Sequence, residues 1–258
     1  MLREEWDQAF GQAPGGSNEG ESLETACSVT LSANAGVFLR LGGCQIWIDA
    51  LHTKKIPGFS TVTPELWAQL QKGETFRAPD VICFTHCHTD HYSRALTLQA
   101  KSLWPKAKVI LPEPEFQDQI LLSGNETRFT VGDLSLRFFR LPHEGEKFAG
   151  VPHYGLLISR GGFHVLVPGD CEVASPLLAK ALDGMAVDLA LLDFPWITLR
   201  HGREFIEKIL RPGHLLIYHL PFAQDETNRY RTVSARCAQR LDVPDVRLLT
   251  EPLQCEVI

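Results

Sequence analysis

The sequence predicts an α/β protein folded as a layered sandwich. Three observations support this fold class. Short apolar runs, typical of β-strands, recur in both halves of the chain. Stretches with the helical spacing of apolar residues lie among these runs in each half. Hydrophobic residues make up 44% of the 258 positions, so the chain can bury a large core. Two strand-rich halves, each closed by helices, therefore favour a layered sandwich.

The N-terminal segment differs in composition from the rest of the chain. Residues 11–22 are rich in glycine and serine and include a proline, which is typical of a loop or a flexible arm. We therefore expect residues 1–22 to form a flexible arm. The remainder shows no internal repeat, low-complexity segment or clear linker, so residues 23–258 are expected to form a single domain.

The first half of this domain alternates short apolar runs with two amphipathic stretches. The expected strands are Ala26–Leu31, Gly36–Leu41, Gln45–Ile48, Val81–Phe84 and Lys108–Leu111, and the expected helices are Thr63–Gln71 and Ser93–Leu103. Val81–Phe84 is apolar throughout, which is typical of a central strand buried on both faces. The first helix would be capped by Thr61 or Thr63, with Pro64 in its first turn.

The second half predicts two hairpins followed by alternating strands and helices. The expected strands are Arg128–Val131, Leu134–Phe139, Leu156–Ser159, Phe163–Val167, Leu189–Leu192 and Leu215–Tyr218, and the expected helices are His201–Leu210 and Thr227–Leu241. Gly132-Asp133 would form the turn of the first hairpin. Gly161-Gly162 would form the turn of the second.

Charge and composition argue against several functional classes. The formal net charge is −6 and the pI is about 5.9, so no global basic surface favours a large nucleic acid as partner. The first twenty residues lack the apolar region of a signal peptide, and no apolar run approaches the ~18 residues of a membrane span. The seven cysteines are scattered without a CxxC pair, which favours free thiols in a reducing cytoplasm.

The most informative segment is Thr85–His91, with the sequence THCHTDH. Three imidazoles and a carboxylate would be costly to bury unless each is paired, whereas one or two divalent cations would satisfy them all. Imidazole and carboxylate ligands suit zinc, with iron or manganese as alternatives. In an extended segment His86 and His88 point the same way and can reach one ion. Asp90 and His91 follow where a helix begins and could serve a second ion.

Further ligands are expected where other predicted strands end, because loops at strand ends carry the chemistry of α/β enzymes. His143 follows the apolar segment Leu134–Leu141. Asp170 and His219 directly follow two other predicted strands. A plain turn carboxylate remains the alternative for Asp170, and a core histidine the alternative for His219.

Taken in order, these residues resemble the metallo-β-lactamase fold hydrolases. The resemblance rests on the HxHxDH motif of His86–His91, a later histidine, Gly169-Asp170, and a late histidine after an apolar strand. It covers the chain from about residue 24 to 221, with further matches at Asn34–Val37, Ile48-Asp49 and Tyr154–Ile158. The HxHxDH motif is specific in this order, whereas Gly-Asp or a lone histidine would indicate little.

The resemblance implies a four-layer αββα sandwich that binds two divalent metal ions, with Zn²⁺ expected and Mn²⁺ or Fe²⁺ as alternatives. The implied ligands are His86, His88 and His143 for one ion, and Asp90, His91, His219 and a bridging Asp170 for the other. Asp49 would orient the His86–His91 loop. His88 occupies the position where diiron flavoproteins of this fold use a glutamate, which favours hydrolytic chemistry over oxygen or nitric oxide reduction.

The middle ligand has two candidates, because His143 and His153 both precede the strand that leads to Gly169-Asp170. The context Leu141-Pro142-His143 matches the family better and favours His143. The loop Glu144–Val151 would then cross the site, and His153 becomes a candidate proton donor to the leaving group.

Four other residues near the motifs have two interpretations each. Cys87 and Cys171 adjoin ligands, but free cysteines are usually small buried hydrophobic residues, and we interpret both in this way. Phe194 and Trp196 follow a predicted buried strand. They could form an apolar wall of the substrate pocket or belong to the core.

By this resemblance we expect a metal-dependent hydrolase. A hydroxide activated by two metal ions would attack a small ester, lactone or phosphodiester, and Asp90 could carry protons. The strand-helix-strand run Leu189–His219 favours the lactonase- and phosphodiesterase-like branch. The alternatives are an oxidoreductase similar to the mononuclear-iron persulfide dioxygenases, and a metal-binding protein without turnover.

Overall fold

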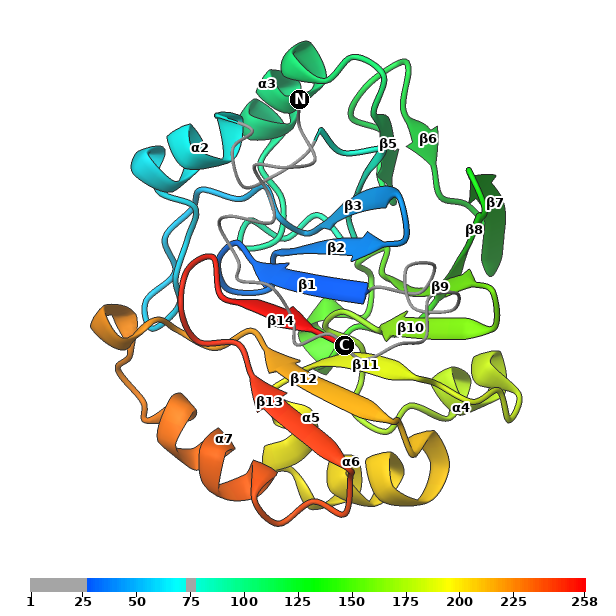
Figure 1. The fold of residues 1–258 in the computed structure, drawn as a ribbon, viewed down its shortest axis with the longest axis vertical. Helices are drawn as coiled ribbons and strands as arrows, with labels where there is room; N and C mark the ends of the chain where they lie inside the picture. Colours follow the sequence, from blue (N-terminus) through cyan, green and yellow to red (C-terminus); the bar gives the residue numbers. More distant parts are fainter. Residues whose placement is uncertain (1–26, 73–77) are drawn as a thin grey trace, which may run out of the picture.

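The structure is a computed structural model that describes residues 27–72 and 78–258. The expected flexible arm, residues 1–22, lies outside the described residues. The described part forms two seven-stranded sheets. The sheets lie against each other, and helices cover both outer faces (Figure 1). The predicted four-layer αββα sandwich is therefore confirmed.

The first sheet has the strand order β14-β1-β2-β3-β4-β5-β6. Its strands are β1 (Cys27–Leu31), β2 (Val37–Leu41), β3 (Cys44–Ile48), β4 (Val81–Cys83), β5 (Lys108–Leu111), β6 (Ile120–Leu121) and β14 (Cys255–Val257). Strands β1 to β3 pair antiparallel, and β3 to β6 pair parallel. Strand β14 pairs antiparallel with β1 and forms the outer edge.

The second sheet has the order β13-β12-β11-β10-β9-β8-β7. Its strands are β7 (Glu126–Val131), β8 (Leu134–Arg140), β9 (Tyr154–Arg160), β10 (Phe163–Val167), β11 (Leu189–Asp193), β12 (His214–Tyr218) and β13 (Asp245–Leu248). Strands β7 to β10 pair antiparallel, with β7–β8 and β9–β10 forming the two predicted hairpins, and β10 to β13 pair parallel.

Two helices cover the first sheet, and each begins at a side-chain cap. They are α2 (Pro64–Gln71) and α3 (Arg94–Leu103). The hydroxyl of Thr63 accepts a hydrogen bond from the Leu66 backbone N–H at 3.2 Å, and Ser93 accepts one from Leu96 at 3.3 Å. These caps satisfy N–H groups that the first helical turn leaves without partners. Of the two threonines considered, Thr63 is the cap.

The helices on the second sheet come from the second half of the chain. They are α4 (Pro176–Leu182), α5 (Pro195–Thr198), α6 (Arg200–Phe205) with its π-helical continuation η2 (Ile206–Leu210), and α7 (Tyr230–Ala238); the 3-10 turns are η1 (Glu146–Phe148) and η3 (Ala223–Asp225). Within the described residues, none of the helices has both the length and the apolar character needed to cross a bilayer.

Strand β11 contributes side chains to two hydrophobic cores, one between the sheets and one between the second sheet and its helices. Its side chains alternate in direction, so Leu189 and Leu191 pack between the two sheets while Ala190 and Leu192 pack under the helices. A sheet covered on both faces needs an apolar residue at every position, and this explains the continuous apolar run seen in the sequence.

Some elements differ from the prediction. The last helix is shorter than expected because Arg229 has a left-handed backbone (φ 57°), so α7 begins only at Tyr230. The expected helix over His201–Leu210 changes from α to π at Ile206. Helix α4 and strands β6, β13 and β14 were not predicted, because they are short and lack a clear periodic pattern.

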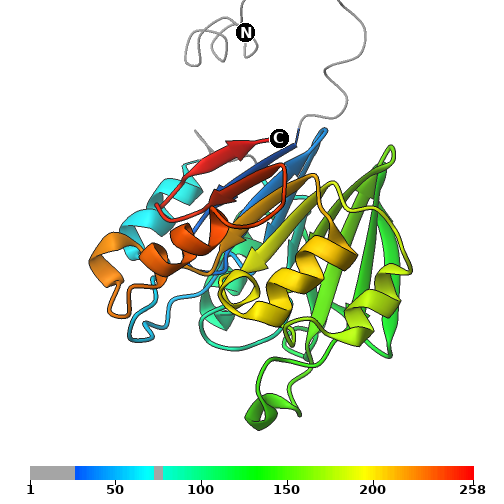
Figure 2. The ribbon, with the colours of Figure 1, turned by 90° about the horizontal axis from the view of Figure 1, so that it is seen from below.

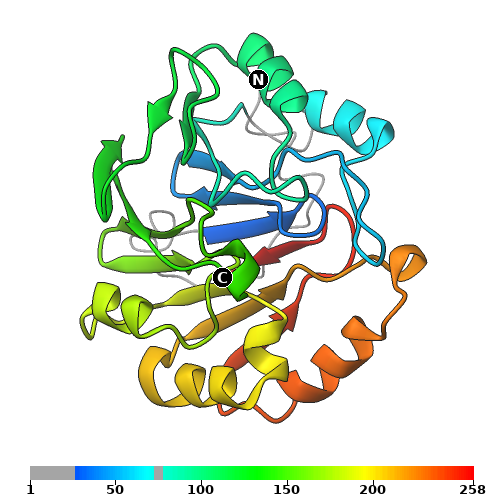
Figure 3. The same cartoon turned by 180° about the vertical axis from the view of Figure 1, so that it is seen from behind.

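The sheet topology brings several strand ends together. The loops after β3, β4, β8, β10, β11 and β12 leave the same edge, since parallel neighbours end at the same side. The loop after β8, which carries η1, extends beyond the rest of this edge (Figure 2). Seen from behind, η1 lies in front of the two sheets (Figure 3). All of the predicted ligands lie on these loops.

Candidate metal centre

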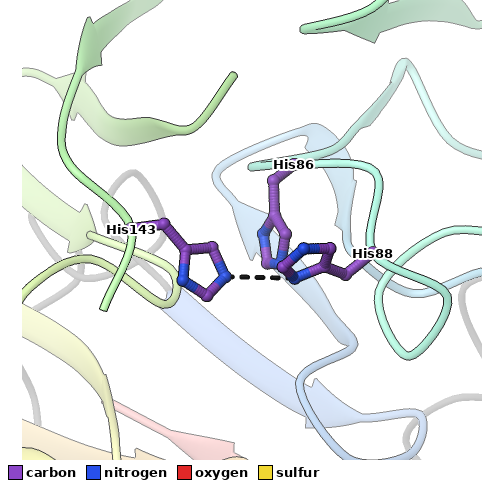
Figure 4. A group of neighbouring side chains, drawn as sticks. All are labelled: His86, His88 and His143. Atoms are coloured by element: carbon purple, nitrogen blue, oxygen red, sulfur yellow. Dashed lines mark hydrogen bonds between the residues drawn. The ribbon is translucent and has the colours of Figure 1, made fainter. Parts of the chain in front are cut away.

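The first group of converging side chains is His86, His88 and His143, whose ring nitrogens lie within 4.8 Å of one another (Figure 4). Nδ1 of His88 and Nε2 of His143 are 3.1 Å apart. Two nitrogens bound tetrahedrally at the usual Zn–N distance of about 2.0–2.1 Å lie ~3.3 Å apart. Nε2 of His86 is buried without a hydrogen-bond partner. These donors therefore fit a divalent ion.

The second group is Asp90, His91 and His219, again with ligand atoms within 4.8 Å of one another. Nε2 of His91 lies 3.2 Å from Nε2 of His219. Oδ2 of Asp90 lies 4.0 Å and 3.9 Å from these two nitrogens. Two imidazoles and a carboxylate at these separations fit a second divalent ion.

Asp170 lies against the second group. Its Oδ2 is 3.2 Å from Nε2 of His91 and 3.5 Å from Nε2 of His219. Its Oδ1 is buried without a partner and remains available as a ligand atom. A carboxylate with one oxygen at the second group and one free oxygen is compatible with the bridging role that the resemblance implies.

Charges in this cluster compensate one another. Burial alone would lower the pKa of His91, but the Asp170 and Asp49 carboxylates raise it well above its usual range. His219 follows the same pattern, since Asp170 outweighs burial and raises its pKa. The pKa of Asp170 lies well below its usual range, because His91 and His219 outweigh its burial. The negative field that stabilises an imidazolium here equally favours a divalent cation.

Asp49 and Thr85 fix the orientation of two imidazoles. Asp49 is fully buried at the end of β3 and accepts hydrogen bonds from the Thr85 backbone N–H at 2.8 Å and from Nδ1 of His91 at 3.0 Å. The Thr85 hydroxyl donates to Asp49 at 2.6 Å and accepts from Nδ1 of His86 at 3.0 Å. In the neutral form, both imidazoles therefore carry their proton on Nδ1 and present Nε2 as a ligand. The orienting role expected of Asp49 is confirmed.

His143 is fixed by the backbone around it. Its Nδ1 donates to the carbonyl of Glu144 at 2.9 Å, which leaves Nε2 free to bind an ion. An isolated β-bridge joins His143 to Cys171, and the Glu144 N–H donates to the carbonyl of Asp170 at 2.9 Å. The side chain of Glu144 also accepts from the Val173 N–H at 2.8 Å. The loops of two ligands are thereby held to each other.

Two backbone positions at the site are constrained. His219 has a left-handed backbone (φ 58°), which is uncommon outside glycine, and its N–H donates to the carbonyl of Asn34 at 3.1 Å. Gly169 also has a positive φ of 62°. A Cβ on Gly169 would lie 2.8 Å from Cβ of Thr85 and 2.9 Å from Nε2 of His153, so a side chain does not fit there.

The two candidates for the middle ligand occupy different positions. His143 belongs to the first group, whereas His153 does not appear in any of the ligand groups formed by the described residues. The His153 ring lies 5.2 Å from that of His86, is 0% exposed, and has no partner for either nitrogen. Burial lowers its pKa to about 3. The His153 ring is thus buried beside the imidazole of His86, and its role as proton donor to the leaving group stays a prediction.

The cysteines beside the ligands remain thiols. Burial raises the pKa of Cys171 well above its usual range, and burial also raises that of Cys87. Trp196 is fully buried in the core, so only Phe194 of the two expected wall residues is partly exposed.

One buried carboxyl group at the site was not predicted. Asp193 ends β11, between the strands that lead to Asp170 and His219. It is 6% exposed, its Oδ1 has no partner, and burial followed by the charge of Asp170 raises its pKa well above the usual range. The signal was available, since an aspartate follows a fully apolar run here as at Asp49.

Similarity to solved structures extends over most of the chain. Igni18, a metallo hydrolase from Ignicoccus hospitalis, has a TM-score of 0.65 and 18% identity, covering 91% of this chain and 99% of that chain. An isothiocyanate hydrolase from Delia radicum gut bacteria has a TM-score of 0.61 and 16% identity, covering 90% and 98%. CmlA, a diiron β-hydroxylase from Streptomyces venezuelae, has a TM-score of 0.60 and 15% identity, covering 91% and 54%. At these identities, the likeness shows the fold alone.

Sequence comparison identifies the family. No curated protein gives a significant match to the sequence. The family described as Beta-lactamase superfamily domain matches residues 46–229, which is more than half of the 258 residues. That range contains every one of the candidate ligands. The chain therefore belongs to the metallo-β-lactamase superfamily, with its αββα fold and a candidate metal site of histidine and aspartate side chains.

Proposed function

We propose that this protein is a metal-dependent hydrolase that binds two divalent ions, Zn²⁺ before Mn²⁺ or Fe²⁺, and cleaves a small ester, lactone or phosphodiester. The observation that carries the proposal is the convergence of two ligand groups from both sheets at one edge. Three imidazoles there are held by neighbouring groups with one nitrogen directed at the site. Such preorganisation is costly to build and supports a functional metal centre.

The ions and the side chains around them would have different roles in hydrolysis. When bound, two divalent ions supply Lewis acidity and lower the pKa of a water molecule from 15.7 towards ~7. Asp90 is suited to hold the proton of that water, because its Oδ2 faces both His91 and His219 while its side chain remains 17% exposed. Asp170 lies against the second group through Oδ2, and its Oδ1 has no protein partner and would be available to an ion.

Three further interpretations of the sequence belong to this proposal. They are a small-molecule substrate, membership of the lactonase- and phosphodiesterase-like branch of the superfamily, and a cytoplasmic location. All seven cysteines are free in the structure, which agrees with a reducing compartment.

Elemental analysis and an activity panel test the proposal together. We expect close to two divalent ions per chain after reconstitution, and hydrolysis of bis(p-nitrophenyl) phosphate or of a lactone that follows metal content. Asp170→Ala should remove nearly all activity. Cys87→Ser is the matched control, because its thiol lies beside the ligands without belonging to either group.

Two outcomes would contradict the proposal. A single tightly bound iron would favour the oxidoreductase interpretation. Hydrolysis that resists chelators and disappears when a cysteine is alkylated would show a covalent mechanism instead.

A further inference from the structure

Aromatic rings contact the ligand imidazoles at both ends of the cluster. Phe148, from the loop after β8, lies 4.8 Å from the ring of His88 and 4.8 Å from that of His143, both in the first group. Phe59, from the loop after β3, lies 5.0 Å from the ring of His219 in the second group. The two phenyl rings therefore bracket the site where a substrate would meet both ions.

The burial of Phe148 contrasts with that of its loop. Residues 144–147 and 149–150 are exposed, while Phe148 is half-buried. The loop extends beyond the edge of the sheets (Figure 2), and its one half-buried phenyl ring contacts the imidazoles of His88 and His143. The Lys147 ammonium lies 4.6 Å from the ring centre. The loop thus brings one apolar group to the first ligand group.

Phe59 is held in place by a network of its own. Its ring stacks on Tyr230 at 6.0 Å, and Tyr230 stacks on Phe194 at 4.7 Å. The adjacent Ser60 accepts from a backbone N–H at 2.7 Å and donates to Asp225 at 2.8 Å in the loop after β12. All three stacked rings are partly exposed. This stack forms a fixed apolar face beside His219.

We propose that Phe148 and Phe59 are the two apolar walls of the substrate site, and that at least one group joined by the cleaved bond is hydrophobic, an acyl chain or an aryl ring. The proposal rests on the proposed hydrolase function and narrows its substrate class. A small polar substrate would gain nothing from two partly exposed phenyl rings. An acyl or aryl group would bury apolar surface against both.

The apolar surface that a bound tail buries against the two rings determines the expected gain in affinity. Each methylene removed from water is worth a factor of up to about four in affinity. An inhibitor with a hydrophobic tail should therefore bind more tightly with each added carbon, until the added carbons no longer contact the ring of Phe148 or Phe59. A ring that only supports the imidazoles would produce no dependence on tail length.

Binding of hydroxamates to the Co²⁺-loaded protein tests the walls without turnover. Acetohydroxamate, hexanohydroxamate and benzohydroxamate share one metal-binding group and differ only in the tail. We expect the two larger inhibitors to bind the wild type at least ~10-fold more tightly than acetohydroxamate. Phe148→Ala and Phe59→Ala should each reduce this ratio. Phe129→Ala, which removes a half-buried ring from edge strand β7, should leave it unchanged.

Two results would overturn the proposal. One is equal affinity of the wild type for all three hydroxamates. The other is an equal loss for all three in both wall variants, which would show that the rings only hold the ligands in place. If affinity depends on the hydroxamate tail but no ester, lactone or phosphodiester is hydrolysed, the proposed hydrolase function is refuted, and the assignment of Phe148 and Phe59 as apolar walls is supported. If hydrolysis occurs without tail dependence, the walls alone are refuted.

Discussion

Replacing Asp49 by asparagine should weaken metal binding through the imidazole of His91, which Asp49 holds by a hydrogen bond to Nδ1. Both carboxylate oxygens are occupied, one by the Thr85 N–H and the other by the Thr85 hydroxyl and Nδ1 of His91. In Asp49→Asn, the amide oxygen can still accept from the Thr85 N–H. The amide NH₂ then faces the protonated Nδ1 of His91, and two donors meet. Relief requires His91 to move its proton to Nε2, the nitrogen that should bind the ion.

The expected loss of metal affinity can be estimated from this hydrogen bond. Loss of an outer hydrogen-bond partner of a ligating histidine costs ~10–100-fold in metal affinity, which corresponds to about 1.4–2.8 kcal/mol. Asp49 contacts His91 directly and His86 only through Thr85. We therefore expect the ion of the second group to be affected more than the ion of the first.

Competition with a chromophoric Zn²⁺ chelator measures both dissociation constants. Asp188→Asn is the control, because Asp188 also caps a backbone N–H, that of His164 at 2.7 Å, but precedes β11 at the opposite edge. Circular dichroism should show that both variants are folded. Unchanged affinity for both ions in folded Asp49→Asn would refute the proposed role of the hydrogen bond to His91.

Two further predictions concern histidines. His143→Ala should abolish binding of the first ion while His153→Ala retains both, as elemental analysis would show; a metal within bonding distance of the His153 ring would reverse this assignment. Burial lowers the pKa of His52 to about 4 from 6.5, so the folded protein resists a proton that the unfolded chain accepts. Stability should therefore fall by ~3 kcal/mol as the pH drops from about 6.5 to 4, and urea titrations of His52→Gln should lack this part of the loss.

The contiguous part of the site could be predicted from the sequence, because residues close in the chain reveal their spacing directly. His86 to His91 lie in one loop, and their ligand types are evident without a structure. The distant ligands could be named only through the resemblance. His143 and His153 lie at opposite ends of the loop between β8 and β9, and the β-bridge between His143 and Cys171 holds the His143 end beside the other ligands.

Contacts made by ordinary residues could not be predicted. Phe59 and Phe148 lie in loops without a periodic pattern, and their proximity to the ligands depends on how those loops close over the edge. Thr85 resembles any strand-end threonine until the positions of Asp49 and His86 are known. In the fold, the amphipathic and apolar runs predicted the type of each element better than its ends, as in α7, whereas β13 and β14 are defined by pairing with distant strands.

The pairing of β14 with β1 has a consequence for how the protein folds. Residues Cys255 to Val257 lie beside Ser28 to Thr30, so the edge of the first sheet closes only when the two ends of the domain meet. Contacts between residues so far apart in the chain slow folding, because the loop entropy is lost before the pairing is gained. Until then β1 presents an unpaired edge, which is a template for aggregation. The yield of refolded protein should therefore fall as the protein concentration rises, because chains that have not yet paired β14 with β1 can associate through this edge.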